Sequence, residues 1–233
     1  MLEATGLRKT FVLHLQGGVR LPVLDRVDCA LQAGRCLVLA GPSGAGKSTL
    51  MRALYGSYRV DGGAIRVRHQ GAFVDLAAGD PRLVLDVRRE TLGYVSQFLR
   101  VIPRVSALQI VAEAARGPDA RAKAEALLLR LNIPRRLHEL PPATFSGGEQ
   151  QRVNLARGFI GGHPILLLDE PTASLDAENR DAVIELILEA KARGAALAGI
   201  FHDGAVREAV ADSVLTVSPA ERDACNERVG AIG

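Results

Sequence analysis

The stretch GPSGAGKST at residues 41–49 limits the possible folds of this chain more than any other part of the sequence. It fits the pattern G-x-x-x-x-G-K-[ST], in which a glycine-rich loop leads from a strand into a helix and surrounds phosphate oxygens with backbone N–H groups. The apolar run CLVLA precedes the loop, and KSTLMRAL follows it, with Gly56 as a helix stop. The sequence therefore predicts an α/β fold built around a phosphate-binding loop.

Each residue type in this loop suits a nucleotide and its metal ion. We expect Lys47 to reach the β- and γ-phosphates of ATP and the hydroxyl of Ser48 to ligate Mg²⁺. A tight structural turn would use the glycines but would not need Lys-Ser-Thr. Phe11 either belongs to the core or stacks on adenine. The predicted phosphate cradle consists of Gly41, Pro42, Ser43, Gly44, Ala45, Gly46, Lys47, Ser48 and Thr49.

Composition argues against several other classes of protein. No apolar run approaches the roughly 18 residues of a membrane span, and the N-terminus lacks a secretory signal, so we expect a cytoplasmic protein without direct membrane insertion. Cys29, Cys36 and Cys225 form no Cys-x-x-Cys pair, which disfavours a disulfide framework or a zinc site. Aromatic residues are only 4% of the chain and do not alternate with basic ones, so nucleic acid is not an expected partner.

The order of the expected elements predicts where ligands bind. Residues up to about 35 and residues 62–76 predict an antiparallel sheet, because β-branched and apolar residues alternate with turn signals. The runs CLVLA, LGYVS, ILLLD and AALAGIF predict strands that alternate with helices, which implies a parallel sheet with ligands at its carboxyl edge. Periodic apolar positions from about 98 to 142 predict a small helical insertion between two of these strands.

Four polar residues end three of these strands. In ILLLDE, we expect Asp169 to hold Mg²⁺ and Glu170 to polarise the attacking water, although one carboxylate could merely cap the next helix. Gln97 and His202 would each, taken alone, more often be satisfied core residues. Because they share the strand-end position, we predict that Gln97 contacts magnesium and water and that His202 contacts the γ-phosphate.

A second anion-binding pattern occurs at FSGGEQQR, residues 145–152. Ser146, Gly147 and Gly148 open a helix, and the N–H groups at a helix start attract negative charge. The route through the helical insertion places this turn too far from Lys47 to serve the same nucleotide. We therefore predict two chains arranged head to tail, with ATP held between the phosphate cradle of one and the Ser-Gly-Gly turn of the other.

Together these motifs resemble the nucleotide-binding domain of ATP-binding cassette (ABC) proteins over essentially the whole chain. The resemblance identifies residues 41–49 as Walker A, ILLLDE as Walker B, FSGGEQ as the signature, SLD with Asp176 as the D-loop, Gln97 as the Q-loop and His202 as the switch histidine. It implies a P-loop NTPase (RecA-like) core with an antiparallel β subdomain and a helical signature subdomain. The implied division is one domain, 1–233, with the β subdomain and catalytic core at 1–97 and 163–233 and the helical part at 98–162.

Two residues depart from the usual LSGGQ form of the ABC signature. Phe145 replaces its leucine, and Glu149 replaces its glutamine. Both flank the Ser-Gly-Gly turn, so the expected effect of the departures is on turnover.

Three longer stretches, at 9–24, 94–108 and 144–160, resemble the PhnL family of the bacterial phosphonate C–P lyase system. That resemblance implies an ATPase subunit supporting formation of α-D-ribose 1-methylphosphonate 5-triphosphate from methylphosphonate and ATP. The implied partners are PhnG, PhnH, PhnI, PhnJ and PhnK, and the implied dimer forms with itself or with PhnK.

Two other functions compete with this one. The first is the ATPase subunit of a transporter, most similar to the lipoprotein-release type, with a permease helix docked beside Gln97. The second is an interaction module that closes on ATP and hardly hydrolyses it.

Overall fold

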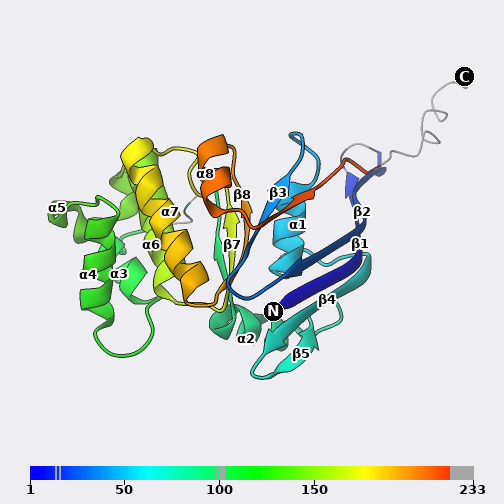
Figure 1. Ribbon diagram of the computed structural model, residues 1–233, viewed down its shortest axis with the longest axis horizontal. Coiled ribbons are helices and arrows are strands. Elements are labelled where there is room, and N and C mark those ends of the chain that lie inside the picture. The colour runs from blue at the N-terminus through cyan, green and yellow to red at the C-terminus, as the bar shows by residue number, and fades with distance from the viewer. Residues whose placement is uncertain (14, 16, 98, 100–102, 221–233) are drawn as a thin grey trace, which may run out of the picture.

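Two β-sheets organise the computed structural model, which describes residues 1–13, 15, 17–97, 99 and 103–220. The predicted antiparallel sheet is present, and its strand order is β2-β1-β4-β5 (Figure 1). In β4 the side chains of Ile65 and Val67 point into the core, and their neighbours Arg66 and Arg68 are exposed. The strands are β1 (Leu2–Leu13), β2 (Val19–Leu31), β4 (Gly62–His69) and β5 (Ala72–Asp75).

The second sheet is parallel and has the order β6-β7-β8-β3-β9. Its central strands are apolar on both faces because both faces are covered. In β3, Cys36 and Val38 belong to one hydrophobic core, and Leu37 and Leu39 belong to the other. The strands are β3 (Cys36–Ala40), β6 (Leu92–Val95), β7 (Ile165–Asp169), β8 (Ala196–Ile200) and β9 (Ser213–Thr216).

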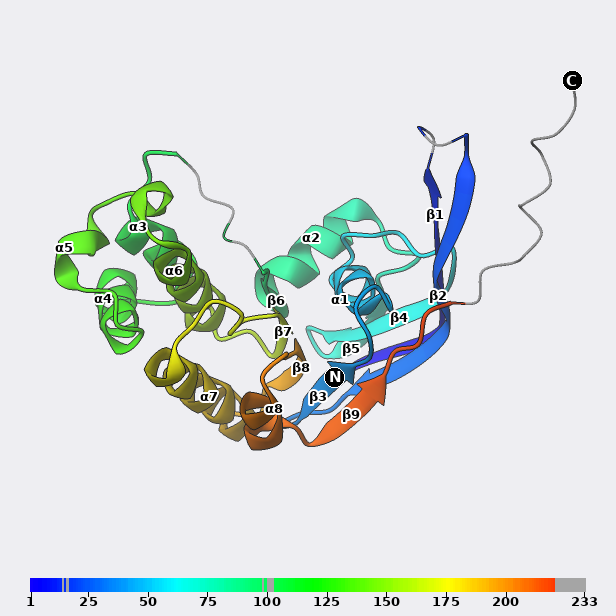
Figure 2. The ribbon, with the colours of Figure 1, turned by 90° about the horizontal axis from the view of Figure 1, so that it is seen from above.

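Helices cover the two faces of the parallel sheet unequally. One core contains residues of α1 (Lys47–Leu54) and α2 (Pro81–Glu90) together with the antiparallel sheet. The other contains residues of α6 (Gly147–Ile160), α7 (Ala177–Ala192) and α8 (Gly204–Val210). Helices α3 (Ala107–Ala112), α4 (Ala120–Arg130) and α5 (Arg135–His138) lie at the end of the molecule opposite β1 and β2 (Figure 2). Together with the short 3₁₀ helix η2 (Pro142–Thr144) they form the helical elements.

Several boundaries differ from the sequence-based expectation. The strand predicted at LGYVS ends at Val95, so Ser96 and Gln97 lie in the following loop. Helix α2 was not predicted, although Asp80 caps it and Pro81 is its first residue, a recognisable start signal. Strand β9 and helix α8 were not predicted either.

Part of the predicted helical insertion, residues 98 and 100–102, lies outside the described residues, as does Cys225. The division of the domain at 98–162 therefore stays a prediction. In the part of the chain that the structure describes, no helix combines the length and the apolar character needed to cross a membrane.

Candidate nucleotide site and the groove beside it

The phosphate loop, residues 41–49, joins β3 to α1 and has a backbone that side chains would obstruct. Gly41 has φ 134°, and a Cβ atom there would lie 2.3 Å from the carbonyl oxygen of Val217. Gly46 has φ 96° and is the N-cap of α1. The ammonium group of Lys47 donates to the carbonyl oxygens of Gly41 and Pro42, both at 2.8 Å, and so lies over the loop. A loop and a lysine in this arrangement fit a polyphosphate.

Two groups suited to magnesium lie side by side beneath this loop. The hydroxyl of Ser48 donates to Oδ1 of Asp169 at 3.1 Å, and Asp169 is only 2% exposed. Mg²⁺ prefers hard oxygen ligands and is usually bound by one or two carboxylates plus substrate phosphates. No cluster of three or more His, Cys, Asp or Glu side chains that could enclose a metal occurs among the described residues. A hydroxyl and a carboxylate placed side by side, as in Ser48 and Asp169, fit a magnesium ion that is shared with nucleotide phosphates.

Tyr94 is a residue of this site that the sequence analysis missed. It lies on β6, beside β7, and its hydroxyl donates to Oδ2 of Asp169 at 2.7 Å. Burial is the main cause that raises the pKa of Tyr94 above its ordinary value, and the hydrogen bond to Asp169 is the second, so the phenol stays protonated. The available signal was its place in the strand that precedes Gln97.

The structure brings Glu170, Gln97 and His202 together. Oε2 of Glu170 accepts a hydrogen bond from Nε2 of Gln97 at 2.8 Å, and Oε1 lies 2.7 Å from Nε2 of His202. The expected contacts of Gln97 with magnesium and of His202 with the γ-phosphate stay predictions. What the geometry adds is that both side chains hold the same carboxylate.

The Ser-Gly-Gly turn begins α6 and is capped by its own residues. The hydroxyl of Ser146 accepts from the N–H of Glu149 at 3.3 Å, and the carboxylate of Glu149 accepts from the Ser146 N–H at 2.8 Å and from its hydroxyl at 2.7 Å. These bonds from Ser146 lower the pKa of Glu149. Within the described residues, no hydrogen bond joins Ser146, Gly147 or Gly148 to the phosphate loop.

Asp176 and Phe11 have structural partners of their own. The carboxylate of Asp176 caps α7 by accepting from the N–H of Asn179 at 3.0 Å. The ring of Phe11 meets Tyr58 edge-on at 5.4 Å, and Nζ of Lys9 lies 5.3 Å from its centroid. The stacking of Phe11 on adenine stays a prediction, and so does the nucleotide contact that the D-loop resemblance implies for Asp176.

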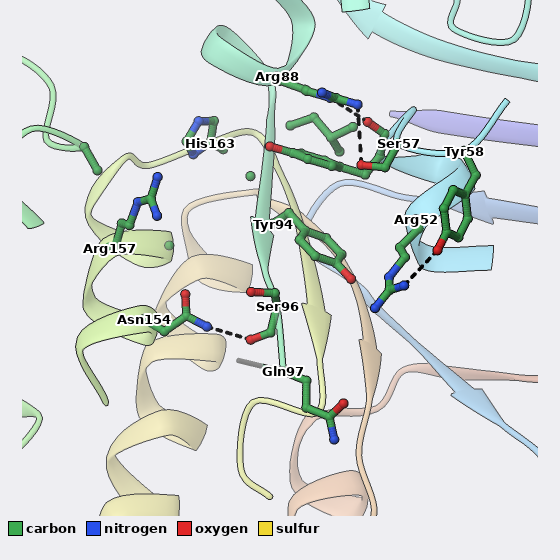
Figure 3. A pocket seen from close by; sticks show the side chains of 15 residues that line it. Arg52, Ser57, Tyr58, Arg88, Tyr94, Ser96, Gln97, Asn154, Arg157 and His163 are labelled. Atoms are coloured by element: carbon green, nitrogen blue, oxygen red, sulfur yellow. Dashed lines mark hydrogen bonds between the residues drawn. The ribbon is translucent and has the colours of Figure 1, made fainter. Parts of the chain in front are cut away.

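Gln97 also lines a groove of ≈ 680 Å³ (Figure 3). Arg52, Arg88 and Arg157 reach it from α1, α2 and α6, and neither Asp nor Glu lines it among the described residues. Tyr55 and Tyr94 also line it, with stacked rings 4.9 Å apart, and the guanidinium of Arg88 lies 4.6 Å from the Tyr55 ring centroid. The groove is therefore basic and partly aromatic.

Helix α6 is tied to two of the three loops that carry the strand-end residues. The amide of Asn154 donates to the carbonyl oxygen of Ser96 at 2.6 Å, next to Gln97. The amide of Gln151, one turn earlier on the helix, donates to the carbonyl oxygen of Pro171 at 3.1 Å. Both amide side chains are 5% exposed, so these are interior bonds, and the sequence analysis missed both.

Comparison with known proteins gives consistent matches over most of the chain. The model of a family described as "ABC transporter" matches residues 24–173. The lipoprotein-releasing system ATP-binding protein LolD of Idiomarina loihiensis is 37% identical over 196 residues, covering 82% of this chain and 84% of LolD. The macrolide export ATP-binding/permease protein MacB of Sodalis glossinidius is 35% identical over 211 residues, covering 88% of this chain but 31% of MacB. A solved dimeric structure of MJ0796, a bacterial ABC transporter cassette, has a TM-score of 0.82 at 25% identity and covers 93% of this chain and 94% of its own.

These relatives correct two predictions. The assignment to the phosphonate C–P lyase system is wrong, and so is the expected set of partners PhnG, PhnH, PhnI, PhnJ and PhnK, because the matching proteins are transporter ATPases. The physical reason lies in the residues that suggested that system. Two of the three stretches, 94–108 and 144–160, include Gln97 and the start of α6, which are predicted to act on the nucleotide and so do not specify a partner.

Proposed function

The chain belongs to the ABC transporter family, and from that premise we propose that it is the ATP-hydrolysing subunit of a transporter of the lipoprotein-releasing type. An ABC ATPase domain of this kind binds ATP with Mg²⁺ and hydrolyses it. The observation that supports the transporter assignment most strongly is the match to LolD, which covers 84% of that protein at 37% identity. We place the subunit on the cytoplasmic side of a membrane, next to a permease.

The strand-end geometry supports distinct roles for the reacting groups. Lys47 and the loop N–H groups hold the β- and γ-phosphates, while Ser48 and Asp169 face the magnesium ion, with Gln97 near both metal and water. Bound magnesium neutralises phosphate charge. Glu170 takes a proton from the attacking water, and we assign to His202 both the orientation of that carboxylate and a contact with the γ-phosphate.

We place two copies of the chain head to tail around ATP. The first N–H groups of a helix have no partner within the helix, so Gly147 and Gly148 can donate to the γ-phosphate held by the other copy. Such donors contribute about 1.5–3 kcal/mol each to a charged acceptor. The match to a dimeric ABC cassette supports this arrangement. Hydrolysis removes the contacted phosphoryl group, and the two copies then separate.

The groove beside Gln97 is the proposed contact with the permease. Residues of α1, α2, β6 and α6 line it, so a bound segment would contact α1 and β6 beside the nucleotide site and α6 at the same time (Figure 3). Its three arginines and the absence of lining acids among the described residues favour a segment with acidic side chains.

A deletion strain tests the proposal. Loss of this chain is expected to leave lipoproteins in the membrane from which they are normally released, and wild-type protein but not Glu170→Gln should restore release. Recovery of the tagged protein with a permease after detergent extraction supports the transporter role. Recovery with soluble partners alone contradicts it, and normal lipoprotein sorting in the deletion strain contradicts the assigned cargo.

A further inference from the structure

Tyr94 contributes to the groove and to the metal site at the same time. Its ring lines the groove and stacks on Tyr55 at a centroid distance of 4.9 Å and an interplanar angle of 26°. Its hydroxyl donates to Oδ2 of Asp169 at 2.7 Å. In Figure 3 the side chain extends from β6 with its hydroxyl toward Arg52, away from Arg157 and His163.

We propose that Tyr94 is a positioning residue for the magnesium carboxylate, and that it links the groove to the metal site. Its hydroxyl fixes Asp169 through Oδ2, so that Oδ1 stays beside the hydroxyl of Ser48. The inference rests on the proposed role of Asp169 as a residue that faces magnesium.

The surroundings of Tyr94 define the direction of this hydrogen bond. The guanidinium of Arg52 lies on the side to which the Tyr94 hydroxyl points, and it donates to the hydroxyl of Tyr58 at 2.9 Å (Figure 3). A carboxylate oxygen only accepts, so the proton of the Tyr94 hydroxyl is directed to Asp169. Because Asp169 is 2% exposed, bulk water does not replace this donor readily.

A partner that hydrogen-bonds a metal-binding carboxylate orients it for the ion. Loss of such a partner typically lowers metal affinity by about 10- to 100-fold. The stacked ring of Tyr55 restrains Tyr94 from the groove side, and the guanidinium of Arg88 lies over Tyr55. Any segment that shifts this aromatic pair therefore changes the position of the carboxylate of Asp169.

The test measures how much Mg²⁺ tightens ATP binding, using a fluorescent ATP analogue and a Glu170→Gln background that prevents turnover. The dissociation constant is measured with Mg²⁺ and with EDTA, and the ratio is the magnesium gain. Tyr94→Phe keeps the ring and removes the hydroxyl, so its magnesium gain is expected to fall about 10- to 100-fold. Binding in EDTA should stay within about twofold of the parent, because the phosphate loop is untouched.

Tyr55 supplies the matched control. Tyr55→Phe removes a hydroxyl from the neighbouring ring without touching Asp169, and should leave the magnesium gain unchanged. Tyr55→Ala removes the ring on which Tyr94 stacks, and should lower the gain. Thermal unfolding in EDTA checks that each variant is folded. If Tyr94→Phe is less stable than the parent, both proteins are compared at a temperature below its melting transition, and a reduced gain is again expected.

Asp169→Asn tests the magnesium role of Asp169 separately from the positioning role of Tyr94. If Asp169→Asn loses the magnesium gain while Tyr94→Phe behaves like the parent, the role of Tyr94 is wrong and the metal site stands. If Asp169→Asn keeps the full gain, the assigned metal site is wrong and the inference fails with it. An unchanged gain in Tyr55→Ala, with a reduced gain in Tyr94→Phe, removes only the link to the groove.

Discussion

Nε2 of His202 lies 2.7 Å from Oε1 of Glu170. The other carboxylate oxygen accepts from Gln97, so both oxygens of Glu170 are held by side chains from different loops. The backbone of Glu170 has φ 53°, a region that residues other than glycine enter rarely and that recurs at functional sites. Backbone and neighbours together fix where this carboxylate points, as a base aimed at a single water requires.

Replacing Glu170 by glutamine should stop hydrolysis while preserving nucleotide binding. The amide keeps the shape and one acceptor oxygen but cannot take a proton from water, and such a base typically contributes about 10²- to 10⁴-fold to the rate. Phosphate release and ATP affinity, measured on the same preparation, check this. Glu208→Gln, which changes an exposed acid on α8, is the control. Equal hydrolysis by wild type and Glu170→Gln would mean that the chain closes on ATP without Glu170 acting as base.

His202→Ala should reduce the hydrolysis rate about 10- to 100-fold, which corresponds to the 1.5–3 kcal/mol of a hydrogen bond to a charged group. The alanine leaves Oε1 of Glu170 without its contact to His202, so the carboxylate keeps only one of the two side-chain contacts that orient it. The affinity for ATP should change much less than the rate, because the phosphate loop is intact. Steady-state kinetics distinguish the two effects. A large loss of affinity with an unchanged rate would show that His202 acts mainly on the bound phosphate.

Glu149→Gln should favour the ATP-bound dimer. Glutamine serves in a capping box as glutamate does, so stability should hardly change. The substitution removes a negative charge beside the Ser146 N–H and hydroxyl, where the γ-phosphate of the second copy is proposed to bind. Light scattering in a Glu170→Gln background should show dimers at several-fold lower ATP concentration. Glu113→Gln, which changes an exposed acid at the end of α3, is the control. If Glu149→Gln and Glu113→Gln dimerise at the same ATP concentration, the proposed effect of the Glu149 charge is wrong.

Asp176→Ala should lower the melting temperature at neutral pH, because it removes the cap of α7. The N–H of Asn179, and then its side-chain amide, lower the pKa of Asp176 below its ordinary value. A carboxyl with a lowered folded-state pKa stabilises the protein above the unfolded-state pKa, and this contribution is lost as pH falls through the folded-state value. The difference between wild type and Asp176→Ala should therefore shrink toward acidic pH in a series of melts. Asp176→Asn retains a cap and should match wild type at neutral pH.

The sequence predicted the parts of this fold whose residues carry strong local signals. The apolar runs at Cys36–Ala40 and Ile165–Asp169 and the glycine loop defined two strands and the phosphate site, because both faces of a parallel strand are buried and few other loops need Gly-Lys-Ser. Helix α2 was overlooked although the sequence carries its signals: Asp80 and Pro81 mark its start, and Leu83, Val84 and Val87 recur at helical spacing and pack on the core.

The contacts of Tyr94 and Asn154 could not be predicted from the sequence. The bond from Tyr94 to Asp169 exists because β6 lies next to β7 in the sheet, and the bond from Asn154 to Ser96 exists because α6 packs beside the end of β6. Neither neighbour is specified by a local sequence pattern. The prediction of the partner proteins was wrong for a related reason. Motifs predict the residues expected to bind ATP, whereas the groove that we propose as the permease contact is assembled from α1, α2, β6 and α6 only in the folded chain.

Asn154→Ala should weaken both stability and hydrolysis. The amide is 5% exposed and donates to the carbonyl oxygen of Ser96 at 2.6 Å, so its loss removes a buried hydrogen bond between α6 and the loop that carries Gln97. The free energy of unfolding should fall by about 1–3 kcal/mol, and the rate should fall because Gln97 no longer holds Glu170 in place. Denaturant unfolding and ATPase assays check this, with Gln109→Ala, an exposed amide on α3, as the control. If Asn154→Ala loses stability but hydrolyses ATP at the wild-type rate, α6 supports the fold without positioning Gln97.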